Sequence, residues 1–318
     1  MKKFFFHGAS VTQQSKEDSY IYQLRELMVD FAEISISSKG YGGCHFSPTA
    51  ILTVIRDVSA EAMVDVCVLE WNTTGLGYFS GDDLAYVVGS LVEMNVRPVF
   101  LILGRLETLR SNRQAEDSVL DFCLRNDIFV WDLRSCVGAS DFRDVVHTNN
   151  SGAMKYAVEL SKLVTSFDFC SDKKSQTSID FKRREISVTE PLLIDVAENS
   201  TLVINVSGIL GSNSSIGIET VHGPASGCIN IHEYSKINMW DKWSHYDRLG
   251  FISIGPLKHE ASCLVLRIEV LPDPIDYTDC ARAGFCFLHE KVFKVRRLFS
   301  TNCKIEEYYV EPSLSIGP

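Results

Sequence analysis

The sequence predicts two domains of different class: an α/β domain over residues 1–165 and an antiparallel β-sandwich or jelly-roll domain over residues 179–318. In the first part, short apolar runs alternate with amphipathic segments, which is typical of a parallel sheet covered by helices on both faces. In the second part, short runs rich in β-branched residues recur between Gly, Asn, Ser and Pro, as in antiparallel sandwiches. A polar stretch over residues 166–178 separates the two patterns and predicts a linker.

The first domain is expected to contain five parallel strands joined by helices. Its apolar runs have the length of buried strands, and the segments between them place apolar residues at helical spacing. The expected strands are Lys3–Phe6, Phe31–Ser37, Val64–Trp71, Val96–Leu103 and Ile128–Asp132, and the expected helices are Tyr20–Met28, Pro48–Val58, Asp82–Met94, Ala115–Arg125 and Gly152–Val164. Open sheets of this kind bind ligands beyond the carboxyl ends of their strands, so the residues that follow each run are the first candidates for chemistry.

The second domain is expected to be built from short antiparallel strands. Turn residues separate its apolar runs at intervals of very roughly 8–15 residues, as in a sandwich or jelly roll. The expected strands include Leu192–Val196, Thr201–Val206, Ile216–Val221, Cys228–His232, Phe251–Ile254 and Cys263–Val270.

Charge and composition exclude several classes of function. The chain has 31 Lys and Arg against 41 Asp and Glu, a formal charge of −10, and neither half is basic, so we expect no nucleic-acid partner. No apolar run approaches the roughly 18–20 residues of a membrane span. The N-terminal apolar stretch Phe4–Phe6 is too short for a signal peptide, and the ten cysteines include no C-x-x-C pair. We therefore expect reduced thiols, no metal site and a cytoplasmic protein.

Candidate reactive residues follow four of the expected strands. Ser10 lies on a turn at the end of the first strand, where a nucleophile is well placed, although serine is also a common helix cap. Gly43 and Asn72 follow the second and third strands; both are ordinary turn residues, and both can also supply N–H donors to an oxyanion. Asp144 and His147 follow the fifth strand, three residues apart, so that the carboxylate can orient an imidazole base.

The order of these residues resembles the block order of the SGNH (GDSL-like) hydrolases. The resemblance rests on Gly8-Ala9-Ser10, Gly43, Trp71-Asn72 and Asp144-x-x-His147, followed by Asn149 and Gly152, and it covers residues 1–165 only. It implies a flavodoxin-like three-layer α/β/α sandwich. It also implies a catalytic triad of Ser10, His147 and Asp144, with an oxyanion hole formed by the backbone N–H groups of Ser10 and Gly43 and the side chain of Asn72.

Two positions depart from the family's pattern. Ala9 stands where the family usually has Asp, which removes a structural carboxylate and leaves the nucleophile in place. The third block, usually Gly-x-Asn-Asp, is Glu70-Trp71-Asn72-Thr73 here and keeps only the Asn. Trp71 beside the oxyanion donor suggests a reshaped pocket.

His45 and Arg105 follow the second and fourth strands and are, with Trp71, weaker candidates for contacts with the substrate. A loop histidine and a solvated arginine are the ordinary alternatives for the first two.

Three functions follow from these residues. The first is a serine esterase that removes a short acyl group, acetyl above all, from a carbohydrate or a related metabolite. The second is a polysaccharide O-acetyltransferase that uses the same Ser10 and takes acetyl from acetyl-CoA; a cytoplasmic enzyme would meet that donor. The third, ranked below both, is a glycan-binding protein whose catalytic domain has decayed. Neither catalytic mechanism requires a cofactor bound to the protein.

Overall fold

The computed structural model describes residues 1–14, 16–74, 79–106, 114–167, 181, 183–209, 213–240, 246–258, 263–272 and 290–312. The chain forms two compact units, Met1–Arg183 and Arg184–Pro318, each with its own core. Residues 168–178 of the predicted linker lie outside the described residues.

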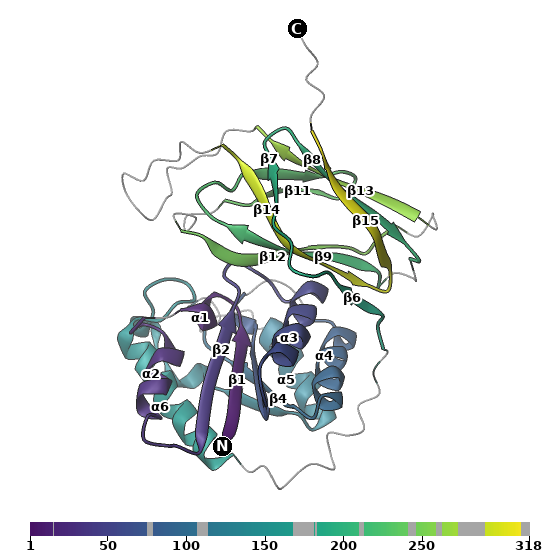
Figure 1. The fold of residues 1–318 in the computed structure, drawn as a ribbon. Helices are drawn as coiled ribbons and strands as arrows, with labels where there is room; N and C mark the ends of the chain where they lie inside the picture. Colours follow the sequence, from purple (N-terminus) through teal and green to yellow (C-terminus); the bar gives the residue numbers. More distant parts are fainter. Residues whose placement is uncertain are drawn as a thin grey trace. The chain divides into compact units, whose positions relative to one another are not determined.

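The N-terminal unit contains a sheet of five parallel strands (Figure 1). In chain order the strands are β1 (Lys2–Gly8), β2 (Ile34–Gly40), β3 (Val66–Glu70), β4 (Arg97–Ile102) and β5 (Phe129–Asp132). Their order across the sheet is β2-β1-β3-β4-β5, the doubly wound order of flavodoxin-like proteins. The chain reverses direction across the sheet at β1, so the ends of β1, β2 and β3 meet at the switch point where such folds bind ligands.

Helices cover both faces of this sheet. They are α1 (Ser10–Gln13), α2 (Tyr20–Leu27), α3 (Pro48–Ala60), α4 (Gly81–Glu93), α5 (Gln114–Asn126) and α6 (Asn150–Ser166), with short 3₁₀ turns η1 (Asn72–Thr74), η2 (Arg134–Cys136) and η3 (Ala139–Asp141). In Figure 1, α2 and α6 lie on one side of the sheet and α3, α4 and α5 on the other. The predicted three-layer α/β/α sandwich is therefore confirmed. Within the described residues, no helix combines the length and the hydropathy needed to cross a bilayer.

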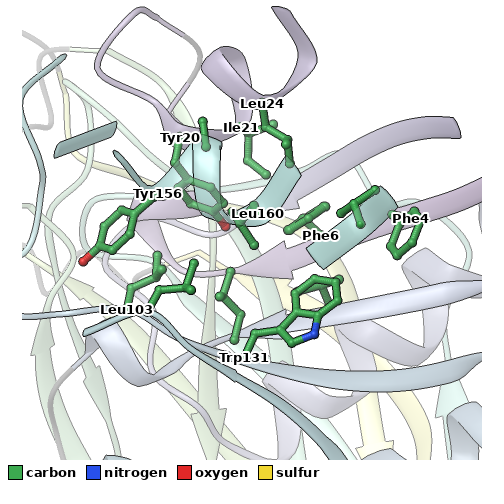
Figure 2. Close-up of a cluster of buried hydrophobic side chains, with 14 of the residues drawn as sticks. Phe4, Phe6, Tyr20, Ile21, Leu24, Leu103, Trp131, Tyr156 and Leu160 are labelled. Carbon is green, nitrogen blue, oxygen red and sulfur yellow. The ribbon is translucent and has the colours of Figure 1, made fainter. Parts of the chain in front are cut away.

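The hydrophobic core under α2 and α6 explains which side chains of β1 point to each face of the sheet (Figure 2). Successive side chains of a strand point to opposite faces, so Phe4 and Phe6 pack under these helices while His7 points to the α3 side. Tyr20 of α2 and Tyr156 of α6 are fully buried against the same cluster. This packing fixes β1, and with it the turn that begins at Gly8.

The C-terminal unit is an antiparallel β-sandwich, as predicted. One sheet has the order β11-β10-β13-β8-β15, the other has the order β12-β9-β14-β6, and β7 also pairs with β14. The strands are β6 (Ile186–Val188), β7 (Ile194–Ala197), β8 (Thr201–Ser207), β9 (Ser215–His222), β10 (Cys228–Ile231), β11 (Ser235–Asn238), β12 (Arg248–Ile254), β13 (Cys263–Leu271), β14 (Val292–Thr301) and β15 (Lys304–Glu311). Alternate residues of both sheets form one hydrophobic core, which includes Ile204, Ile218, Ile268 and Leu298.

Candidate active site

Ser10 begins a short helix directly after β1. Ala9 is the extended residue before α1, and its N–H donates to the carbonyl oxygen of Glu70 at 3.1 Å. Gly8 allows the turn to lie this close to β3, because a Cβ atom at Gly8 would be 2.1 Å from the same carbonyl oxygen. The Ser10 side chain is partly buried at the carboxyl edge of the sheet.

His147 lies between Ser10 and Asp144. Its Nε2 is 3.0 Å from Ser10 Oγ, and its Nδ1 is 2.9 Å from Asp144 Oδ2. The Asp144 carboxylate also accepts backbone N–H bonds from Val146 at 3.0 Å and from His147 at 2.8 Å. These bonds close a tight turn, so the carboxylate fixes both the backbone and the ring of the histidine.

Asp144 is a carboxylate over the whole neutral pH range. Burial disfavours its charge, but the hydrogen bonds from the ring and backbone of His147 and from the Val146 N–H outweigh this and hold the pKa of Asp144 well below its usual range. An ionised Asp144 stabilises the imidazolium that forms when His147 takes a proton. Ser10, His147 and Asp144 thus form a continuous hydrogen-bonded chain with the order expected of a nucleophile, a base and an orienting acid.

Asn72 begins the 3₁₀ turn η1, directly after β3, and is buried. Its Nδ2 donates to the carbonyl oxygen of Leu103 at 2.8 Å, and its Oδ1 accepts the Leu103 N–H at 3.2 Å. The amide therefore joins the ends of β3 and β4. A primary amide has two N–H donors, and the pairing with Leu103 uses one of them.

Gly43 lies in the turn that follows β2 and is exposed. Its φ of 75° is in the left-handed region, where glycine is favoured. The same turn is tied to the nucleophile strand, because the Tyr41 N–H donates to the Gly8 carbonyl oxygen at 3.0 Å. Within the described residues, no hydrogen bond joins Gly43 or Asn72 to Ser10, Asp144 or His147.

The three weaker candidates differ in exposure. His45 is exposed, and partial desolvation together with the positive charge of Arg105 lowers its pKa. Arg105 is buried and donates to the Thr73 carbonyl oxygen. Trp71 is also buried and packs with its ring centroid 5.6 Å from that of His7 and 6.4 Å from that of Phe46. Only His45 of the three reaches solvent.

A small apolar cavity lies beside Asn72. Its lining includes Phe46, Trp71, Phe79 and Phe100 together with Asn72 itself. Trp71 therefore bounds an apolar space next to the amide that is a candidate oxyanion donor.

Two buried carboxyl groups near the site were not predicted from the sequence. Glu70, which the sequence marks only as a departure in the third block, is fully buried at the end of β3. Asp57 of α3 accepts hydrogen bonds from His7 Nε2 at 3.1 Å, Tyr41 Oη at 2.7 Å and Lys39 Nζ at 2.8 Å. The sequence does contain a hint of a role for Glu70, because a carboxylate stands in the third block while the usual one is missing from the first block. No sequence pattern indicates a role for Asp57.

The carboxylates near the site belong to separate networks. Asp57 is bonded to His7, Asp144 is bonded to His147, and Glu70 is bonded to two threonines. Among the described residues, no group of three or more His, Cys, Asp or Glu side chains is arranged to hold a metal ion.

The chain is similar in structure to a two-domain esterase, CEX, that is active on acetylated mannans. The TM-score is 0.50 at 10% sequence identity, over 94% of this chain and 91% of that chain. Two weaker matches cover the N-terminal half. One is the M. smegmatis aryl esterase, with a TM-score of 0.40 and 13% identity over 52% of this chain and 99% of that one. The other is a lipolytic protein of the G-D-S-L family from Desulfitobacterium hafniense DCB-2, with a TM-score of 0.38 and 10% identity over 51% and 99%.

No protein-family model matches the sequence, and no curated protein does. The similarity to known proteins is therefore one of fold. The resemblance to the SGNH (GDSL-like) hydrolases predicted from the sequence is confirmed at that level: residues 1–183 form the expected α/β unit, and the chain is similar in fold to a two-domain esterase.

Proposed function

We propose that this protein is a serine esterase that acts through Ser10, His147 and Asp144. The observation that carries the proposal is the hydrogen-bonded chain of these three side chains, with separations of 3.0 Å and 2.9 Å. The base lies within reach of the hydroxyl proton, and the carboxylate holds the base in the required orientation.

The reaction proceeds through an acyl-enzyme. His147 takes the Ser10 proton as the oxygen attacks the ester carbonyl, and the negative charge on the carbonyl oxygen is stabilised by the N–H groups of Ser10 and Gly43 and the side chain of Asn72. The C–O bond to the alcohol then breaks, and the alcohol leaves with the proton from His147. Water, activated in turn by His147, hydrolyses the acyl-enzyme and restores the Ser10 hydroxyl.

The acyl group is short, acetyl in the first place, and the alcohol belongs to a carbohydrate or a related metabolite. One comparison supports this choice. The two-domain esterase that is similar in fold over 94% of this chain is active on acetylated mannans. The exposed His45 is the candidate contact with the sugar, whereas Trp71 and Arg105 are buried and would support the site without reaching solvent.

The test is hydrolysis of an aryl acetate by the parent, by Ser10→Ala and by Ser161→Ala. Ser161 is a half-buried serine of α6 whose hydroxyl donates to the Val158 carbonyl, so its loss leaves the site intact. We expect the parent and Ser161→Ala to release the aryl alcohol at the same rate and Ser10→Ala to retain none of the enzymatic rate. Equal rates for the parent and Ser10→Ala would refute the proposal.

A parallel incubation with acetyl-CoA and an oligosaccharide separates the esterase from the acetyltransferase alternative. Release of CoA that depends on the acceptor, together with acetylation of the sugar, would identify a transferase. A fluorophosphonate probe that fails to label Ser10 in the folded protein would instead support a non-catalytic glycan-binding role.

A further inference from the structure

Glu70 occupies the junction between the two turns of the proposed catalytic site. It is the last residue of β3, the central strand, and it is paired in parallel register with Gly8 of β1. The Ser10 turn begins directly after Gly8, and the Asn72 turn begins two residues after Glu70. Its side chain is fully buried at this point.

Its carboxylate is hydrogen-bonded to both turns. Oε2 accepts the Thr12 hydroxyl at 2.8 Å, and Thr12 lies in the helix that Ser10 begins. Oε1 accepts the Thr73 hydroxyl at 2.6 Å and the Thr73 N–H at 3.4 Å, and Thr73 directly follows Asn72. One carboxylate therefore connects the helix of the nucleophile with the turn of the oxyanion amide.

The connection continues beyond the two threonines. Tyr20 Oη is 2.8 Å from Thr12 Oγ1, which extends the network into α2. The Thr73 carbonyl oxygen accepts a hydrogen bond from Arg105, which extends it to the loop after β4. The Ser10 turn also lies directly against Glu70, since a Cβ atom at Gly8 would be 2.9 Å from Glu70 Oε2. The helix α1, the turn η1, the helix α2 and the loop after β4 are thus linked through the side chain of Glu70.

A carboxylate is a costly choice for this buried position. No Lys, Arg or His of the described residues forms an ion pair with Glu70, and its partners are two hydroxyls and backbone N–H groups. Burial of a carboxyl without a cation is unfavourable, and an apolar side chain would pack there at lower cost. The polar group is therefore better explained by the geometry it imposes on the two turns than by stability.

On the basis of the function proposed above, we infer that Glu70 is a positioning residue, which fixes the Ser10 helix relative to the Asn72 turn. From β3 it supplies a structural carboxylate in place of the Asp that the resembled family usually has at the position of Ala9. Glu70 does not touch the substrate. It acts through Thr12 and Thr73, by holding the nucleophile and the oxyanion donor at a constant separation.

The test compares kcat and KM for an aryl acetate in Glu70→Ala, Glu70→Gln and Thr12→Val. The control is Glu219→Gln, which alters another buried glutamate, paired with Arg297 at 2.9 Å in the β-sandwich. The rate at which a fluorophosphonate labels Ser10 is measured on the same samples. All assays are run at a temperature at which circular dichroism shows each variant to be folded.

We expect Glu70→Ala to lose about 10²-fold in kcat, the order of loss found when one oxyanion donor is misplaced, with KM nearly unchanged. Labelling of Ser10 should slow in parallel. Glu70→Gln should stay within about tenfold of the parent, because the amide keeps two polar atoms in place and the Thr12 hydroxyl can reverse its role. Thr12→Val removes one of the two hydroxyl bonds to Glu70 and should lose about tenfold in kcat. Glu219→Gln should keep the parental kcat.

A folded Glu70→Ala with the parental kcat, or with a loss confined to KM, would overturn the inference. So would a loss of kcat in Glu219→Gln as large as that in Glu70→Ala. If Glu70→Ala does not fold, Thr12→Val decides, and a parental kcat in that variant counts against the inference. A parent that neither hydrolyses esters nor reacts with the probe at Ser10 would instead refute the proposed function itself.

Discussion

The Nε2 atom of His147 lies 3.0 Å from the hydroxyl oxygen of Ser10, although 137 positions of the chain separate the two residues. The distance follows from the topology. Ser10 begins α1 directly after β1, His147 lies in the loop before α6, and parallel strands bring such segments to one edge of the sheet. A hydroxyl and an imidazole in this contact form a nucleophile–base pair.

Asp144→Asn should lower kcat for an aryl acetate by about 10³–10⁴-fold, with a small effect on KM. The amide can still accept the backbone N–H groups of Val146 and His147, so the turn should remain folded. It carries no charge to stabilise the imidazolium, and its NH₂ group favours the wrong tautomer of His147. Steady-state kinetics and thermal unfolding of the same sample check both parts.

The matched control is Asp132→Asn at the end of β5, where the carboxylate pairs with Arg134 at 2.6 Å. This variant should keep the parental kcat. Equal losses of kcat in the two variants would mean that removing any carboxylate at this edge of the sheet lowers activity. The specific role assigned to Asp144 would then be refuted.

Asn72→Ala should reduce both activity and stability, unlike Ser10→Ala. Loss of one oxyanion donor lowers kcat by about 10²–10³-fold. The substitution also leaves the buried N–H and carbonyl of Leu103 without the amide that pairs with both, at a cost of about 1–3 kcal/mol for each such group. Urea unfolding and kcat are measured together.

Asn126→Ala is the control for this substitution. Asn126 also donates from its side-chain amide to a backbone carbonyl, that of Phe122, near the end of α5. We expect its loss to lower stability slightly and to leave kcat unchanged. A folded Asn72→Ala with the parental kcat would remove Asn72 from the oxyanion hole.

Much of the fold could be predicted from the sequence because local signals and burial agree. The helix expected at Tyr20–Met28 is observed at Tyr20–Leu27, and the strand expected at Thr201–Val206 is observed at Thr201–Ser207. Helix starts are marked by serine or asparagine caps, such as Ser47, whose hydroxyl accepts the Ala50 N–H. The late strand β15 (Lys304–Glu311) was not predicted: it is mostly exposed or half-buried, so its apolar pattern is weak.

The site was harder to predict than the fold, because its supporting contacts are long-range. The order of Ser10, Gly43, Asn72, Asp144 and His147 is visible along the chain, and this order led to the triad. The bonds from Thr12 and Thr73 to Glu70 depend on the register of β1 against β3, which no local pattern encodes. Nor does spacing show that the Asn72 amide pairs with Leu103.

Gly8→Ala should destabilise the protein and slow the labelling of Ser10. A Cβ atom there would lie 2.1 Å from the Glu70 carbonyl oxygen, which is backbone and cannot move aside without shifting β3. Gly81→Ala is the control: a Cβ at Gly81, in the first turn of α4, meets no atom within 4 Å, and alanine favours helix. We expect a clear drop in melting temperature for Gly8→Ala and none for Gly81→Ala. Equal melting temperatures would contradict the close packing of β1 on β3.

Asp57→Asn should cost about 3–5 kcal/mol of unfolding free energy. Burial opposes its charge, but hydrogen bonding to His7 and the positive charges of Arg56 and Lys39 prevail and hold the pKa of Asp57 well below its usual range. Asparagine keeps one acceptor oxygen but replaces the other with an NH₂ group, and it removes the negative charge that pairs with Arg56 and Lys39. The control, Glu159→Gln, breaks the exposed pair with Lys162 and should change stability by less than about 1 kcal/mol. Urea unfolding at neutral pH compares the two, and similar small losses would show that the Asp57 cluster is not stabilising.

Glu70 should make the unfolding free energy fall as the pH rises from about 4.5 to about 7. Burial raises the pKa of Glu70 to about 7 despite the hydrogen bonds from Thr73 and Thr12, whereas the carboxyl of the unfolded chain titrates near 4.5. Between these values the folded protein holds a proton that the unfolded chain has released, so increasing pH favours unfolding. The neighbouring phenol of Tyr20 stays neutral in this range, because burial raises its pKa well above 10.

Glu70→Gln has no carboxyl at this position and isolates the effect. Urea unfolding of the parent and the variant is compared at pH 5 and pH 8; contributions from all other titrating groups cancel in the difference. Relative to the variant, the parent should be more stable at pH 5 than at pH 8, by up to about 3 kcal/mol. The sign is specific to a raised carboxyl pKa, since a carboxylate stabilised by a cation would give the opposite trend. A difference that does not vary with pH would show that Glu70 titrates in the folded protein as it does in the unfolded chain.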